Sequence, residues 1–227
     1  MKKRKLFTVT NIIILICIFV YIIDRFVLGG AFSDIGEPSI VVAGKDLGES
    51  KLLIQILGLN FGKLYKFMAL LIIDGKISNF WQPFTYIFMH QFILHIIVNL
   101  IALYIVGNKI EKDRGVCLTL FTFIATGIIG VFIANAIVPV DYSATAGSSI
   151  AVLGLIGTSL GMCLTEKGYI KSFSKKSKIY LIIYCLIFTY TSGTWTMVAH
   201  NVGLVLGLSS YLIYHYLVYS KKKIFNN

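Results

Sequence analysis

The sequence predicts an all-α polytopic membrane protein, a bundle of six transmembrane helices. Hydrophobic residues occupy 57% of the 227 positions and charged residues only 14%, and the mean hydropathy is +0.82. A soluble domain of this size cannot bury so much apolar surface. An aromatic content of 14% and long apolar runs also exclude a disordered chain, because such chains are poor in aromatic and apolar residues. The charges stand in clusters between long neutral stretches, which is typical of a chain that crosses a membrane several times.

Five neutral stretches supply the helices of this bundle. Crossing the hydrocarbon, which is roughly 30 Å thick, takes about 20 apolar residues. The last stretch has 42 residues and therefore holds two spans, with a break at Ser192-Gly193. The first stretch lacks the small-residue cleavage site of a signal peptide, so we expect it to be a membrane helix. The stretches are 6–23, 77–108, 116–140, 142–165 and 179–220.

The distribution of basic residues predicts the orientation of the bundle. Fifteen of the 21 lysines and arginines lie in the two tails and in the loops after spans two and four. Basic residues accumulate on the cytoplasmic side of a membrane, so we expect the short tails 1–5 and 221–227 to be cytoplasmic. The net charge of +11 then follows from topology, and no nucleic-acid partner is expected. We treat residues 1–227 as a single membrane domain.

A long loop of about residues 29–82 is predicted to join spans one and two on the outer face. Its apolar part, residues 64–73, is too short to cross the membrane. Such a segment lies in the membrane interface or dips into it. The predicted fold therefore includes an outer loop that is partly embedded in the membrane.

Span two carries polar side chains, which are costly in a membrane and often mark a functional site. His95 and Asn99 are four residues apart, so they share one face of the helix, and His90 lies five residues before His95. Hydrogen bonds between neighbouring helices would explain the pair equally well. Taken alone, the pattern leaves both interpretations open.

The start of span four places a serine at a predicted helix N-terminus. Residues 141–145 are a poor helix start, whereas Ser149 begins a good one. The 16 residues 149–164 span about 24 Å, so this helix is expected to begin below the outer surface. The free amides at a helix N-terminus suit a developing negative charge. A helix of Gly and Ser used only for packing is the alternative.

Span six carries His200 on the same helical stripe as Gly203 and Gly207. Span four has a glycine stripe of its own, and two such faces can approach closely. Spans two, four and six run in the same direction, so their histidines and serine all fall near the outer ends of their helices. Polar residues of three helices are unlikely to meet at one depth by chance, so this convergence indicates a functional site. The stripe on span four is Gly154, Gly157 and Gly161.

Together these residues resemble the rhomboid family of intramembrane serine proteases, over about residues 60–208. Two positions depart from the family pattern: Gln82 stands where the family has Arg after a Trp, and Ile150 where Gly follows the nucleophile. The matching positions are His90, His95, Asn99, Gly147, Ser149, His200, Gly203 and Gly207, with Trp81, Thr85, Gly107, Glu111 and Gly115.

The resemblance implies a six-span core and a Ser-His dyad. Ser149 would be the nucleophile and His200 the general base and then the general acid. The backbone N–H of Ser149 and the side chains of His95 and Asn99 would form the oxyanion hole. The resemblance further implies an enzyme that cuts single-span or other transmembrane proteins within the lipid bilayer, and we expect it in a bacterial plasma membrane. Supporting roles would fall to His90, Gly147, Gly203 and Gly207.

Two other functions remain open at this stage. One is an inactive relative that binds transmembrane clients without cutting them. The other is a channel or transporter that uses the intramembrane histidines as a proton or metal relay. His90 and His95 would diverge by about 140° on one helix, and spans two to six hold no carboxylate to complete a metal set. The four cysteines have no metal-ligand spacing either, so we expect no metal and no cofactor.

Overall fold

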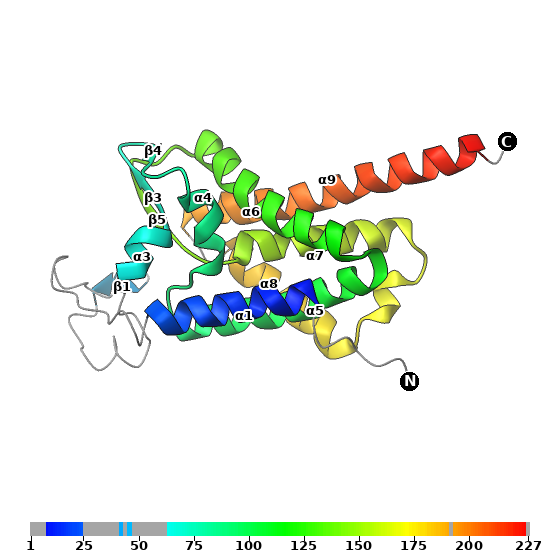
Figure 1. Ribbon diagram of the computed structural model, residues 1–227, viewed down its shortest axis with the longest axis horizontal. Coiled ribbons are helices and arrows are strands. Elements are labelled where there is room, and N and C mark those ends of the chain that lie inside the picture. Colours follow the sequence, from blue (N-terminus) through cyan, green and yellow to red (C-terminus); the bar gives the residue numbers. More distant parts are fainter. Residues whose placement is uncertain (1–7, 25–40, 43–44, 47–62, 191–192, 226–227) are drawn as a thin grey trace.

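The computed structural model describes residues 8–24, 41–42, 45–46, 63–190 and 193–225. Its helices run along one long axis, and a small β-sheet lies at one end, on the left in Figure 1. We call this end the sheet end. At the opposite end α9 extends beyond the other helices. The main helices are α1 (Val9–Ile22), α5 (Ile93–Arg114), α6 (Val116–Ile137), α7 (Ser149–Thr165), α8 (Lys175–Tyr190) and α9 (Thr194–Phe225).

The helices have the lengths and surfaces of an integral membrane protein. Three of them are long and apolar enough to cross a membrane, namely α5, α6 and the Thr194–Val218 part of α9. Apolar side chains such as Phe19, Phe121 and Leu186 are exposed on the outside of the bundle, where lipid would cover them. In α1, α7 and α8 the helical segments have 14, 17 and 16 residues. Because these fall short of about 20 residues, the six-span count stays a prediction.

The neutral stretches correspond to the helices, with one informative difference. Helix α8 ends at Tyr190 and α9 begins at Thr194, so the chain breaks at the predicted place, although Ser192 itself lies outside the described residues. The stretch 77–108 contains more than one helix, because α5 begins only at Ile93. Before it come the short α4 (Gln82–Thr85) and the 3-10 helix η2 (Tyr86–Phe88).

The sheet end adds strands to a fold that we predicted as all-α. Helix α3 (Lys63–Met68) is followed by β3 (Leu70–Ile73), so the predicted interfacial segment 64–73 divides into a helix and a strand. Asp74 and Gly75 have φ angles of 51° and 72° and form the two-residue turn of a β-hairpin. A third strand, β5, pairs antiparallel with the other edge of β3. The remaining strands are β1 (Val41–Val42), β2 (Lys45–Asp46), β4 (Lys76–Ile77) and β5 (Tyr142–Thr145).

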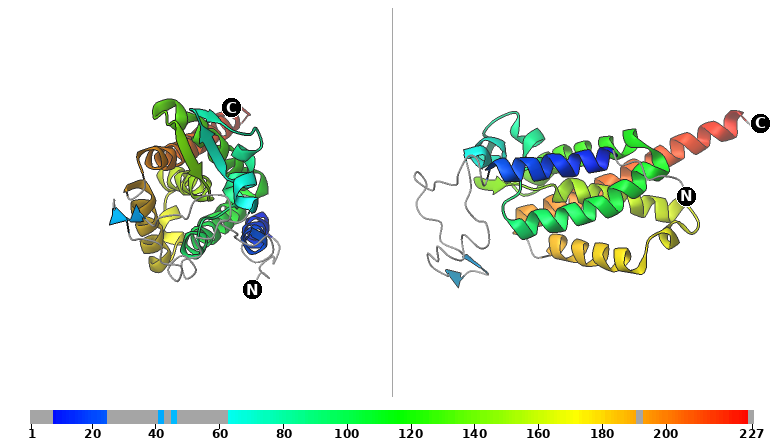
Figure 2. Two further views of the ribbon diagram at one scale, coloured as in Figure 1. Left: turned by 90° about the vertical axis from the view of Figure 1, so that its left-hand side faces the viewer. Right: turned by 60° about the horizontal axis from the view of Figure 1, so that its bottom comes forward.

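Helix α7 forms the centre of the bundle. Thirteen of its seventeen residues are buried, and the other helices surround it when the bundle is viewed along its axis (Figure 2, left). Its small residues allow this, because the predicted glycine stripes bring backbones together. A Cβ atom on Gly207 would collide with the carbonyl oxygen of Gly154, and a Cβ on Gly203 would lie 2.5 Å from the carbonyl oxygen of Ile150. The close approach of α7 and α9 is therefore a contact of main chain with main chain.

Glu111 joins α1 to α5. Its carboxylate accepts hydrogen bonds from the backbone N–H groups of Val9 and Thr10 at 2.9 and 3.0 Å, and from the Thr10 hydroxyl at 2.9 Å. These amides belong to the first turn of α1, where no intrahelical acceptor exists. Gly107 lies one turn away on α5, and a Cβ there would meet the Thr10 side chain at 2.7 Å. Of these two family-matching positions, Gly107 thus lets α1 pack closely on α5, and Glu111 caps the N-terminus of α1.

A second carboxylate joins three helices at the end opposite the sheet. Glu166, just after α7, accepts hydrogen bonds from Arg114 at the end of α5 and from Tyr211 on α9. Burial alone would raise the pKa of Glu166, but these two donors and the charge of Arg114 outweigh it and hold the pKa below its usual value. The contact therefore stabilises the fold at neutral pH and is lost as the pH falls through that lowered pKa.

We predict that Gly207→Ala destabilises the protein while Gly193→Ala does not. The new methyl group on Gly207 meets backbone, which cannot rotate away, whereas nothing lies within 4 Å of a Cβ on Gly193. Overpacking of this kind costs about 1–3 kcal/mol. Thermal unfolding in detergent measures the difference, and equal melting temperatures for the two variants would show that the α7–α9 contact is not close-packed.

Candidate active site

The sheet and a glycine place Ser149 at the first position of α7. Strand β5 ends at Thr145, and the chain turns sharply through Gly147, whose φ is +135°. Side chains rarely adopt this φ, so the position favours glycine. Ser149 follows directly and begins the helix, as predicted, with 6% of its surface exposed. The nucleophile candidate is therefore held between a paired strand and a buried helix.

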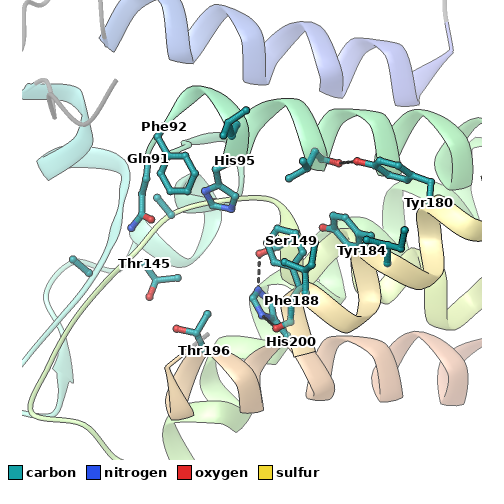
Figure 3. Close-up of a pocket in the computed structure, with 16 residues that line it drawn as sticks. Gln91, Phe92, His95, Thr145, Ser149, Tyr180, Tyr184, Phe188, Thr196 and His200 are labelled. Atoms are coloured by element: carbon teal, nitrogen blue, oxygen red, sulfur yellow. Dashed lines mark hydrogen bonds between the residues drawn. The ribbon is translucent and has the colours of Figure 1, made fainter. Parts of the chain in front are cut away.

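Ser149 and His200 form a hydrogen-bonded pair. The Ser149 Oγ lies 2.7 Å from the His200 Nε2 (Figure 3). On the other side of the ring, the His200 Nδ1 lies 2.6 Å from the backbone carbonyl oxygen of Phe188. A carbonyl can only accept, so Nδ1 carries the hydrogen and Nε2 presents a lone pair to the serine hydroxyl. The imidazole is thus oriented to remove a proton from Ser149.

The carbonyl of Phe188 is a part of the site that the sequence analysis missed. Phe188 lies in the last turn of α8, where carbonyl groups find partners outside the helix. It takes the place that a carboxylate occupies in a Ser-His-Asp triad. A backbone group leaves no residue pattern, and the only signal in the sequence was the predicted break at Ser192-Gly193, which ends α8 near this level.

A cavity of about 460 Å³ opens beside the pair. It lies between α5 and α8, and its walls are mainly apolar apart from the histidines, Gln91, Thr145, Ser149 and Thr196 (Figure 3). This volume can hold a short stretch of peptide next to the serine hydroxyl. The lining residues are Gln91, Phe92, Leu94, His95, Val98, Ala144, Thr145, Ala146, Ser149, Tyr180, Ile183, Tyr184, Ile187, Phe188, Thr196 and His200.

His95 lines the same cavity. Its ring covers Gly147, because a Cβ on that glycine would lie 2.5 Å from the His95 Cε1 and 2.8 Å from its Nε2. The rings of Phe92 and Phe188 flank it, with centroids 5.4 and 5.9 Å away. Three of the predicted site residues, His95, Ser149 and His200, therefore meet at one cavity, each from a different helix.

Asn99 lies outside the residues that line the cavity. Its amide nitrogen donates to the carbonyl oxygen of His95 at 2.8 Å, and its amide oxygen accepts a 2.7 Å hydrogen bond from the hydroxyl of Tyr184 on α8. The side chain is fully buried. This arrangement links α5 to α8 and uses one of the two amide hydrogens. The role of Asn99 as an oxyanion donor stays a prediction.

His90 supports the turn before the nucleophile. Its Nε2 lies 3.2 Å from the Ser148 Oγ and accepts a 3.4 Å hydrogen bond from the Ser148 backbone N–H. The hydroxyl of Ser148 thus contacts His90, while that of the next residue contacts His200. Across the described ranges, no three His, Cys, Asp or Glu side chains form a metal-binding group.

The two departures from the family pattern are accommodated away from the cavity. Gln82 is buried, and its side-chain oxygen accepts a 3.1 Å hydrogen bond from the backbone N–H of Leu71, which fastens α4 to β3. Ile150 does not line the cavity. Its Cγ2 fills the space over Gly130 on α6 and Gly203 on α9. Neither change narrows the space beside Ser149.

We predict that Gly147→Ala lowers the reactivity of Ser149 at least tenfold, because the methyl group strains the turn and displaces His95. Gly168→Ala is the matched control: Gly168 also has a positive φ, of +82°, but nothing lies within 4 Å of its Cβ position. Labelling by a fluorophosphonate, which reacts with activated serines, measures the effect. If both variants lose reactivity equally, backbone strain alone is responsible and the His95 contact is irrelevant.

Comparison with known proteins places this site in a family. Residues 78–217 match the family model described as the Rhomboid domain. Over 127 residues the chain is 28% identical to YdcA of Bacillus subtilis (strain 168), named as a candidate rhomboid protease; the alignment covers 56% of this chain and 63% of that protein. Rhomboid-like proteases 2 and 3 of Toxoplasma gondii are 26% and 27% identical over 60% and 61% of this chain.

The alignments with the two Toxoplasma gondii proteins cover 48% and 54% of those proteins, so the chain matches about half to two thirds of its relatives' length. The family match itself extends from the segment before α4 to residue 217 in α9 and includes Ser149, His200 and the rest of the cavity. Because that match covers more than half of the 227 residues, the chain belongs to the rhomboid family.

Proposed function

We propose that this protein is an intramembrane serine endopeptidase that hydrolyses peptide bonds in or near the transmembrane segments of other membrane proteins. One observation carries the proposal: the Ser149 Oγ lies 2.7 Å from the Nε2 of a histidine whose Nδ1–H is held by the Phe188 carbonyl. Membership of the rhomboid family, and relatives named as rhomboid proteases, support the same reaction class.

The geometry suits a two-step acyl transfer. His200 takes the hydroxyl proton as Ser149 attacks the peptide carbonyl carbon, and a tetrahedral intermediate forms. The resulting imidazolium then gives that proton to the leaving amine, and an acyl-enzyme remains. Water, activated by the same histidine, hydrolyses the ester and restores the serine. The Phe188 carbonyl stabilises the imidazolium, and it keeps the His200 Nε2 directed at Ser149 during both steps.

The N-terminus of α7 supplies stabilisation for the oxyanion. Ser149 is the first residue of the helix, where backbone N–H groups have no intrahelical acceptor and the helix dipole favours negative charge. The backbone N–H of Ser149, with His95 across the cavity and Asn99 one turn below, forms the proposed oxyanion hole. A donor of this kind contributes about 3–4 kcal/mol to the transition state where water is excluded.

The cavity fits a membrane-embedded peptide. Its walls between α5 and α8 are mostly apolar, and Ser149, His95 and His200 line the same cavity. We therefore propose single-span or other transmembrane proteins as substrates. The proposed topology has six spans, α1 and α5 to α9, in one membrane domain with both termini cytoplasmic, which puts the sheet end and the dyad near the outer face of a bacterial plasma membrane. A binding-only relative or a channel has no comparable support, because neither needs an aligned Ser-His pair.

We predict that Ser149→Ala and His200→Ala each abolish cleavage of tagged single-span proteins, by a factor of at least 10³. The double variant should be no slower than either single one, because the two residues act as a unit. Ser148→Ala is the matched control: its hydroxyl contacts His90 instead of His200, so substantial activity should remain. An inactive Ser148→Ala beside an active Ser149→Ala would shift the nucleophile by one residue and overturn the mechanism.

A second prediction separates catalysis from packing at His95 and Asn99. As oxyanion donors, their alanine variants should lower kcat by up to about 10²-fold, with KM and melting temperature nearly unchanged. As packing residues they should lose stability with little change in rate, since interhelical hydrogen bonds in membranes average about 0.6 kcal/mol. Measuring turnover and thermal unfolding on the same samples distinguishes the oxyanion role from the packing role. Early melting together with a wild-type kcat would assign the oxyanion hole to other groups.

A further inference from the structure

The orientation of His200 depends on a helix that carries neither member of the dyad. Its Nδ1–H bonds to a carbonyl of α8, whereas Ser149 is on α7 and His200 on α9. Helix α8 lies at the edge of the bundle (Figure 2, right), and only Tyr184 and Thr189 on it are buried. The acceptor that fixes the catalytic tautomer is therefore carried by a peripheral element whose position needs its own support.

Two tyrosine hydroxyls provide that support. Tyr184 donates to the Asn99 side-chain oxygen and Tyr180 donates to the Val98 carbonyl oxygen, each at 2.7 Å, so both hydrogen bonds join α8 to α5. Tyr180, Tyr184 and Phe188 are four residues apart and lie on one face of α8. The Tyr184 and Phe188 ring centroids are 4.4 Å apart, and the Phe188 ring meets His200 edge-on at 5.2 Å. A continuous series of contacts thus runs from α5, through α8, to the histidine.

We propose that Tyr184 is a positioning residue for the general base: its hydrogen bond to Asn99 docks α8 on α5 and so holds the Phe188 carbonyl on the Nδ1–H of His200. This inference rests on the proposed Ser149–His200 dyad. It also gives the buried Asn99 a function through its oxygen, whereas an oxyanion role would use only its N–H groups.

Small movements of α8 are enough to weaken the hydrogen bond between His200 and the Phe188 carbonyl. The bond from His200 to Phe188 is 2.6 Å long, and hydrogen bonds weaken beyond about 3.2 Å. A shift of about 0.6 Å therefore loosens the group that fixes the tautomer. In other Ser-His enzymes, loss of the correct tautomer lowers kcat by up to about 10⁴. The side-chain hydrogen bonds of Tyr180 and Tyr184 to α5 resist such a shift.

The test removes the hydroxyl groups without removing the rings. The full-length protein in detergent is compared as wild type, Tyr184→Phe and Tyr180→Phe/Tyr184→Phe, with Tyr190→Phe as the matched control. Tyr190 is on the same helix but is exposed. The readout is the second-order rate of Ser149 labelling by a small fluorophosphonate, well below the melting temperature. We expect a loss of about threefold for one hydroxyl and about tenfold for both, with no change in Tyr190→Phe.

A second variant pair distinguishes positioning from general weakening of the fold. In an Asn99→Ala background the partner of Tyr184 is absent, so adding Tyr184→Phe should lower the labelling rate no further. With a transmembrane substrate, kcat should fall while KM stays constant. A wild-type labelling rate in Tyr184→Phe, full additivity with Asn99→Ala, or a loss that matches the unfolded fraction would overturn the inference. Absence of Ser149-dependent labelling in the wild type would instead refute the proposed dyad.

Discussion

The backbone contact between α7 and α9 is the constraint on which the site depends. Ser149 begins one helix and His200 lies in the first two turns of the other, so the distance between their side chains is set by how closely the two axes approach. Glycines at the crossing let carbonyl groups of α7 touch the α-carbons of α9. Larger residues would hold the helices apart by the width of a side chain, and even 1 Å of misplacement can cost about a hundredfold in rate. The rigidity is useful as well, since a contact of main chain with main chain has no rotamers to relax.

A second constraint is the cost of charge in an apolar bundle. A buried carboxylate beside His200 would require heavy desolvation before it could orient the ring. The Phe188 carbonyl performs that orientation as a dipole, and the end of α8 adds the favourable negative end of a helix dipole. Two carboxylates that join helices, Glu111 and Glu166, lie toward the opposite end, where they cap α1 and bind Arg114. A third, the buried Asp24, accepts a hydrogen bond from the Tyr65 backbone and does not line the cavity. Charged groups thus fasten the scaffold, while neutral groups surround the cavity.

The sequence predicts much of this because membrane helices leave strong patterns. Neutral stretches located the main helices, Ser149 was identified as the first residue of α7, and the glycine stripes predicted the α7–α9 contact. The strands at the sheet end were not predicted, because β3 and β5 have only four residues each and their paired residues lie about 70 positions apart in the sequence. The role of the Phe188 carbonyl as the acceptor for His200 was not predicted either, because a backbone acceptor has no sequence signature. Asn99 shows a further limit: spacing placed it on the face of His95, but spacing cannot say that its oxygen bonds to Tyr184 across the α5–α8 boundary.

The division of the site among the helices has a consequence for how substrate and base interact. The cavity beside Ser149 lies between α5 and α8, and the same boundary carries the Tyr184–Asn99 hydrogen bond. In the proposed mechanism, a peptide that fits the cavity would leave the Phe188 carbonyl on His200, whereas a segment bulky enough to push α8 outward would draw that carbonyl away from the ring. Tyr180 and Tyr184 both line this cavity and hydrogen-bond α8 to α5. Under the proposed mechanism, these two residues therefore affect both what fits the cavity and how firmly the Phe188 carbonyl is held on His200.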